Sequence, residues 1–115
     1  MINDHHVDPN RPFLLVRARP KPGARERFEP WFRDVHLADA AKIPGIREVQ
    51  GAATAAGTRL GFYTFESADA VQAALSSPEA AYARGTWEAW AGDLEELGIE
   101  IWAPLFPLPI YQATS

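Results

Sequence analysis

The sequence contains no cysteine, and this absence excludes disulfides, thiolate metal sites and a cysteine nucleophile. No run of about 18 apolar residues occurs either, so no segment is expected to span a membrane. Positive charge is scarce, because 11 Lys and Arg residues stand against 15 Asp and Glu residues for a formal net charge of -4. The arginines are spread along the chain, so we expect neither a nucleic-acid partner nor a membrane surface as partner. A cytoplasmic domain without covalent cross-links is predicted.

Several polar residue types are also sparse. Asparagine occurs only at Asn3 and Asn10, and the only histidine outside the N-terminal dozen residues is His36. A single histidine cannot form a multi-histidine metal site within one chain. No glycine-rich phosphate loop is present, and the two lysines, Lys21 and Lys42, are expected at the surface rather than in a buried Schiff base. We therefore expect no metal and no cofactor, and chemistry limited to acid–base catalysis.

The composition that remains is that of one globular domain. The chain has 115 residues, of which 47% are hydrophobic and 23% are charged. Residues 1–12 are polar and predict a flexible N-terminal arm, in which His5 and His6 are expected to have no function. Residues 13–106 form the predicted domain, and the proline-containing residues 107–115 form a C-terminal extension.

The order of predicted elements indicates an α+β fold. Branched and aromatic residues predict strands at Phe13–Arg19, Ile46–Ala53, Arg59–Phe65 and Ile99–Phe106. Helical spacing begins near Ala24, or near Glu29 if Pro30 interrupts the helix, and ends at Ile43–Gly45. A second helical region lies between the third and fourth strands, which gives a ferredoxin-like βαββαβ order with a four-stranded antiparallel sheet.

The first helix has a distinct apolar line. Its spacing places Phe28, Phe32, Val35 and Asp39 close together along one side, flanked by Trp31 and His36. We expect this side to face the sheet.

The second helical region is interrupted. Ser67 is a favourable N-cap, and Ser77–Glu79 restarts the helix with proline in the first position. A last helical segment is expected after Gly85, with Gly98 at its end and an apolar stripe of Trp87, Trp90, Leu94 and Leu97.

The first and third strands carry apolar residues on both faces. Helices on one side of an antiparallel sheet cover only one of these faces. We therefore expect a homodimer in which two sheets pack face to face. The alternative is a monomer whose C-terminal extension folds over the sheet.

The sequence also resembles a known family. The segment Trp31–His36, followed by Asp39 and by Ile43–Gly45, is similar to the signature of EthD-like proteins, which belong to the dimeric α/β-barrel superfamily. Leu60–Glu66 and Ser77–Glu79 are similar to later parts of that pattern. The resemblance implies a pocket between the sheet and its own helices. Relatives across this superfamily include cofactor-free monooxygenases, polyketide cyclases, lactone isomerases and haem-handling enzymes.

Within the resemblance, His36 is the first candidate catalytic residue. It lies four residues after Phe32, and the proton affinity of histidine near neutral pH suits acid–base chemistry. Asp39 is spaced to hold one ring nitrogen. Asp34 does not have a facing spacing; as a member of the motif it is a candidate to contact substrate, or else to cap or pair locally. The alternative is a structural or solvated histidine beside two solvated carboxylates.

Tyr63 and Arg17 are the next candidates. The Tyr63 hydroxyl could donate to a developing oxyanion or bond a backbone carbonyl instead. Arg17 lies on the face of Phe13 and Leu15, where a buried guanidinium needs either a substrate carboxylate or an internal acid.

Aromatic residues complete the candidate substrate-binding set. Four tryptophans are too many for the centre of a small core, so one or two of them are expected to line a cavity for a flat apolar ligand. The candidates are Trp31, Phe32, Tyr82, Trp87 and Trp90.

Three functions follow as hypotheses. The first is a cofactor-independent enzyme in which His36 moves a proton on an apolar aromatic or polyketide-like substrate, as an isomerase, cyclase or lyase. The second is a cofactor-free monooxygenase, although relatives that oxidise anthrones resemble one another in an asparagine that this domain lacks. The third is a non-catalytic EthD-like ligand-binding or accessory protein. Haem binding through His36 is a separate alternative to these three.

Overall fold

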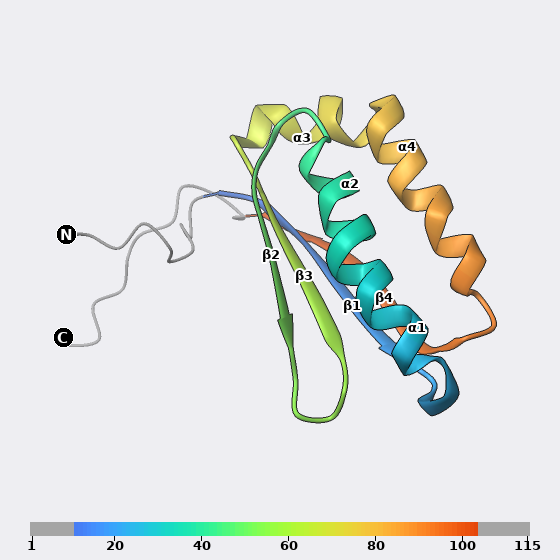
Figure 1. The fold of residues 1–115 in the computed structure, drawn as a ribbon. Coiled ribbons are helices and arrows are strands. Elements are labelled where there is room, and N and C mark those ends of the chain that lie inside the picture. Colours follow the sequence, from blue (N-terminus) through green and yellow to red (C-terminus); the bar gives the residue numbers. More distant parts are fainter. Residues whose placement is uncertain (1–10, 104–115) are drawn as a thin grey trace, which may run out of the picture.

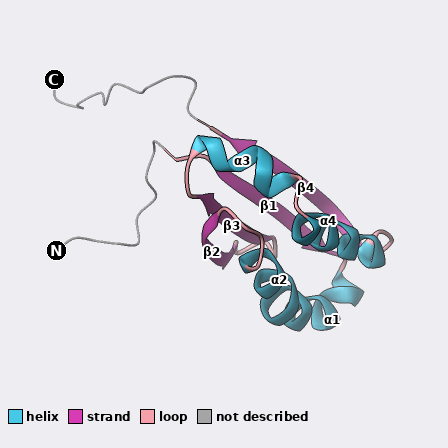
Figure 2. Ribbon diagram, turned by 90° about the horizontal axis from the view of Figure 1, so that it is seen from above, coloured by secondary structure: helices cyan, strands magenta, loops and turns pink. Residues whose placement is uncertain are grey.

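The computed structural model describes residues 11–103, which form one antiparallel sheet with helices on one of its faces (Figures 1 and 2). The strand order is β2-β3-β1-β4, and every neighbouring pair of strands is antiparallel. The predicted ferredoxin-like βαββαβ fold is confirmed. The elements in chain order are β1 (Phe13–Pro20), the 3₁₀ helix η1 (Pro22–Ala24), α1 (Arg25–Pro30), the π-helix η2 (Trp31–His36), α2 (Leu37–Ala41), β2 (Ile46–Ala53), β3 (Arg59–Phe65), α3 (Ala68–Leu75), α4 (Pro78–Gly85), the 3₁₀ helix η3 (Thr86–Trp90) and β4 (Leu94–Trp102).

Most of the predicted N-terminal arm and the whole predicted C-terminal extension lie outside the described residues. At the start of the described part, the Pro12 carbonyl accepts a hydrogen bond from the Phe65 N–H at 3.0 Å, so the chain is attached to the end of β3 there. No helix between residues 11 and 103 is long and apolar enough to cross a bilayer.

The first helix is continuous but changes its hydrogen-bonding pattern. Pro30 lies inside it and has no N–H to donate to the preceding turn. The following segment is π-helical, and the Leu37 N–H bonds the Phe32 carbonyl five residues earlier. This wider turn rotates the side chains that follow, so that His36 is 2% exposed and Val35 is 42% exposed. The prediction that Val35 faces the sheet is therefore wrong, and His36 takes the inward place.

The prediction of a final helix through Leu94 and Leu97 is also wrong. The helix ends with η3 at Trp90, and a turn follows in which the Asp93 N–H bonds the Trp90 carbonyl at 2.8 Å. From Leu94 the chain pairs with β1, and Gly98 lies inside β4 rather than at a helix end. Alternation of apolar and polar residues from Glu96 onward is the local signal that predicts this strand.

The two faces of the sheet differ. Val16, Ala18 and Tyr63 point toward the helices and are at most 1% exposed. The opposite face carries Phe13 and its stacked neighbours Phe62 and Trp102, with ring centroids 4.5 Å and 6.0 Å from that of Phe13. The core therefore lies between the sheet and the helices, and the second face keeps an aromatic patch.

Candidate functional site

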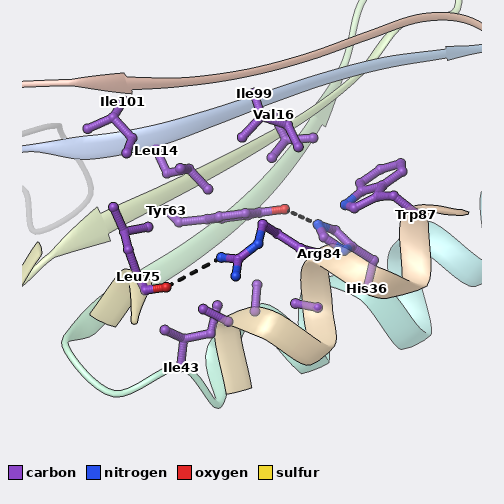
Figure 3. Close-up of a pocket in the computed structure, with 13 residues that line it drawn as sticks. Leu14, Val16, His36, Ile43, Tyr63, Leu75, Arg84, Trp87, Ile99 and Ile101 are labelled. Carbon is purple, nitrogen blue, oxygen red and sulfur yellow. Dashed lines mark hydrogen bonds between the residues drawn. The ribbon is translucent and has the colours of Figure 1, made fainter. Parts of the chain in front are cut away.

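A cavity of about 290 Å³ lies between the helices and the β1–β4 half of the sheet (Figure 3). Its walls are mostly aliphatic, and among the lining side chains of residues 11–103 only His36, Tyr63 and Arg84 are polar or charged. A mostly apolar hollow with a few convergent polar groups is typical of a small-molecule site. The described residues of the lining are Leu14, Val16, His36, Ala40, Ile43, Tyr63, Leu75, Ala80, Ala83, Arg84, Trp87, Ile99 and Ile101.

His36 enters this cavity from η2. Its Nε2 lies 2.5 Å from the hydroxyl oxygen of Tyr63, and Tyr63 is on the face of β3 that points toward the helices (Figure 3). Aromatic rings surround the imidazole, with the Trp31 and Phe32 centroids both 5.4 Å away and the Trp87 centroid 4.7 Å away. Ring packing therefore holds His36 on the helix side, and strand β3 holds Tyr63 on the other side.

Tyr63 reaches His36 because its side chain lies back along its own strand. Gly61 precedes Tyr63 by two residues and lies on the same face of β3. A methyl group on Gly61 would collide with the Tyr63 hydroxyl and lie 2.7 Å from the Tyr63 Cζ. The absence of a side chain at Gly61 is therefore a condition for the position of the Tyr63 ring.

Burial controls the charge of both groups. Desolvation lowers the pKa of His36 from 6.5 to about 4, so the imidazole is neutral at pH 7. This value differs from the near-neutral proton affinity expected from the sequence, because the sequence does not report burial. Desolvation also raises the pKa of Tyr63, which stays a protonated phenol at neutral pH.

The neutral imidazole has two tautomers with different consequences. Nδ1 is buried without a hydrogen-bond partner in the described part of the chain. A proton on Nδ1 would leave that donor unpaired, at a cost of about 1–3 kcal/mol. The resting pair therefore favours the proton on Nε2. In this tautomer Nε2–H donates to the Tyr63 oxygen, and the Tyr63 hydroxyl can donate its own proton to a group in the cavity. In the other tautomer, Tyr63 donates to Nε2.

The predicted aromatic residues divide into two groups. Trp87 lines the cavity, whereas Trp31, Phe32 and Trp90 lie outside its lining and pack around Phe28. Phe28 is fully buried. Trp31, Phe32 and Trp90 therefore support the position of His36 from the side away from the cavity, and they offer no surface to a ligand.

Three predicted polar candidates lie elsewhere. Asp39 does not reach His36; it lies 3.9 Å from the Lys42 ammonium in a separate groove that also contains Tyr82. Asp34 is on the surface and pairs with Arg33 at 3.0 Å. The helix turns these side chains away from the cavity, because the wider π turn directs His36 inward.

Arg17 is on the opposite face of the sheet from the cavity. It pairs with Glu100 on the adjacent strand at 3.5 Å, and both side chains are substantially exposed. Glu100 is the kind of internal acid considered from the sequence, but the expected burial of the guanidinium is wrong, because the Arg17 side chain is 40% exposed.

Arg84 was not predicted from the sequence, and it is the only charged residue that the described part of the chain contributes to the cavity lining. It follows Ala80 by four residues and precedes Trp87 by three, so the helical spacing on α4 and η3 is the signal that would have found it. Ile99 and Ile101 also line the cavity and were not predicted as lining residues, although both lie within the predicted fourth strand.

Between residues 11 and 103, no three His, Asp or Glu side chains are grouped so that they could hold a metal ion. The polar groups that the described lining offers to a ligand are a neutral imidazole, a phenol and a guanidinium.

Solved structures with the same fold provide comparisons. Rv0793 from Mycobacterium tuberculosis is 20% identical, with a TM-score of 0.63 over 86% of this chain and 99% of that protein. An ethyl tert-butyl ether D (EthD) family protein from Bacillus halodurans is 18% identical, with a TM-score of 0.65 over 82% and 99%. A mutant form of SnoaB, a cofactor-independent oxygenase from Streptomyces nogalater, is 18% identical, with a TM-score of 0.61 over 88% and 99%. No protein-family model matches the sequence, and neither does the sequence of any curated protein.

The fold and the site thus define a class: a ferredoxin-like protein with a buried histidine–tyrosine pair beside an apolar cavity. More particularly, the chain shares its fold with an EthD family protein and with a cofactor-independent oxygenase, in agreement with the resemblance seen in its sequence.

Proposed function

We propose that this protein is a cofactor-independent enzyme that moves a proton on an apolar, aromatic or polyketide-like small molecule, in an isomerisation, cyclisation or elimination. The observation that carries the proposal is the hydrogen bond between His36 and Tyr63 at the wall of a cavity with few other polar groups. A neutral imidazole and a protonated phenol side by side supply a base and a hydrogen-bond donor.

The reaction begins from the less favoured tautomer, in which the imidazole proton is on Nδ1 and Tyr63 donates to Nε2. In this tautomer Nε2 is free to accept a C–H or O–H proton from the substrate. The Tyr63 hydroxyl turns from Nε2 to the substrate oxygen and donates to the negative charge that develops there. This step yields an imidazolium and a substrate anion. Return of the proton to a different substrate atom completes an isomerisation.

The low pKa of His36, about 4, also restricts the substrate. A weak base removes protons efficiently only from acidic groups. Phenols and carbon acids activated by a carbonyl group and an aromatic ring or a second carbonyl group are therefore the proposed substrate class.

Deuterium exchange tests the proposal without knowledge of the product. The protein is incubated in deuterium oxide with a panel of carbon acids led by 2-tetralone, a bicyclic ketone with an activated benzylic C–H, and incorporation is followed by NMR. We expect catalysed exchange that falls at least about 100-fold in His36→Gln, as expected for loss of general-base catalysis. The surface variant Asp34→Asn is the matched control and should exchange like the wild type.

Equal exchange by the wild type and His36→Gln would reject the catalytic role of His36. Tight binding of panel members by both proteins without exchange would favour the non-catalytic ligand-binding function instead.

A cofactor-free oxygenase is the second candidate, and the structural likeness to a cofactor-independent oxygenase supports it. It shares the first step, because a substrate anion formed by His36 could then react with oxygen. Oxygen consumption with anthrone, measured with an oxygen electrode, distinguishes the two functions, since isomerisation consumes none.

A further inference from the structure

We propose that Arg84 forms an anion subsite in the cavity, and that the ligand is an apolar ring compound with a carboxylate group. This inference rests on the proposed function, and it specifies the substrate class of the same site. Among residues 11–103, Arg84 is the only charged side chain of the lining. Of the three polar lining residues, it alone offers a full positive charge at neutral pH.

The position of Arg84 follows from the helix that carries it. On α4 and η3, Ala80, Ala83, Arg84 and Trp87 have the spacing of one helix face, and all four line the cavity. Ala80 and Ala83 are 4% and 6% exposed. Their small side chains leave room above the helix, and the long Arg84 side chain extends along that room toward Leu75, away from the His36–Tyr63 bond (Figure 3).

The guanidinium of Arg84 is only partly engaged. Its one hydrogen bond in the described part of the chain runs from Nη1 to the Leu75 carbonyl at 3.4 Å, which is longer than the usual 2.7–3.2 Å range for N–H···O bonds. No carboxylate between residues 11 and 103 forms an ion pair with it. A guanidinium has five N–H donors in a planar fork, and a carboxylate is the group that matches this fork with two parallel hydrogen bonds.

The rest of the cavity specifies the apolar part of the ligand. Leu14, Val16, Ile99 and Ile101 form an aliphatic wall on β1 and β4, and Trp87 adds an aromatic surface. A volume of about 290 Å³ is at the lower end of the usual range for small-molecule sites, so one ring or two fused rings fit best. With its carboxylate on Arg84, such a ligand places its ring system toward His36 and Tyr63.

Calorimetric titration with a matched pair of probes tests the subsite. The probes are 2-naphthoate and the uncharged 2-naphthamide, which have the same ring system. We expect the wild type to bind 2-naphthoate roughly tenfold more tightly than 2-naphthamide, because a charge-assisted hydrogen bond contributes a free energy of this order. Arg84→Gln should remove this preference without weakening 2-naphthamide binding, and Arg84→Lys should retain part of it. Arg47→Gln removes an exposed cation outside the lining and is the control for net charge; its preference should be unchanged.

The inference is overturned if the wild type does not prefer the acid, or if Arg84→Gln keeps the preference. It is also overturned if Arg84→Gln weakens both probes equally, since that result indicates a structural role. These outcomes are separate from failure of the proposed function, because His36→Gln should keep the preference for 2-naphthoate while losing deuterium exchange.

Discussion

At the scale of residues, His36 shows how burial changes the chemistry of a side chain. In the unfolded chain its pKa is near 6.5, and in the folded protein it is about 4. Between these values the unfolded state binds more protons than the folded state, so the free energy of unfolding rises with pH in that interval. Above about pH 6.5 the contribution is flat, because both states are then neutral at this position.

This difference in pKa predicts a loss of stability at mildly acidic pH. On going from pH 7.5 to pH 5, the wild type should lose about 2 kcal/mol more unfolding free energy than His36→Gln, which keeps a hydrogen-bonding side chain but does not titrate. Urea unfolding of both proteins at the two pH values measures this difference. Parallel losses in the two proteins would show that His36 does not have a lowered pKa in the folded state.

At the scale of elements, strand β3 and the first helix cooperate to form the pair. The π turn after Pro30 directs His36 inward, and Gly61 lets the Tyr63 side chain lie along β3 to meet it. Neither feature is sufficient alone, because the hydrogen bond requires both side chains in the same part of the core.

Substitution of Gly61 is the corresponding prediction. The added methyl group of Gly61→Ala should displace the Tyr63 ring and break its bond to His36, at a cost of about 1–3 kcal/mol in stability. Deuterium exchange should fall to the level of Tyr63→Phe, and the double variant should show no further loss. Gly98→Ala, where a methyl group meets open space, is the control and should behave like the wild type.

Independent, additive losses in Gly61→Ala and Tyr63→Phe would contradict this role of Gly61. Urea unfolding of each variant separates a loss of catalysis from a loss of folded protein.

At the scale of the whole molecule, the sheet has an aromatic patch of Phe13, Phe62 and Trp102 on the face that the described helices do not cover. Trp102 is 52% exposed, and the three rings are stacked on the face opposite to the helices. Exposed contiguous apolar patches of this kind mark interaction sites. We propose that a second copy of the chain covers this patch by sheet-to-sheet packing. The apolar residues on both faces of the first and third strands led to the same expectation.

A charged residue within the patch should prevent this association. We expect the wild type to be a dimer at micromolar concentration in light scattering and Phe62→Lys to be a folded monomer, because a buried unpaired ammonium is costly. Tyr82→Lys, at a 65% exposed aromatic position outside the patch, should remain dimeric. A monomeric wild type would reject the proposal.

Much of the fold follows from local sequence. The strand of Ile46–Ala53 and that of Arg59–Phe65 have the predicted bounds, and Ser67 and Ser77 cap helices where predicted. These signals depend on side-chain alternation and on hydrogen bonds within a few residues, so the sequence alone contains them. The candidate site was predictable in part, because His36, Tyr63 and Trp87 lie in its lining.

Other features depended on contacts between distant parts of the chain. Leu94 joins a strand because β1 offers it a partner, and Asp39 faces a different groove from His36 although the two are close in sequence. The sequence by itself determined the order of elements and the residue types available for chemistry. Only the tertiary structure decided which of them meet in the cavity and which protonation states they hold, because burial and long-range packing set both the directions of side chains and their pKa values.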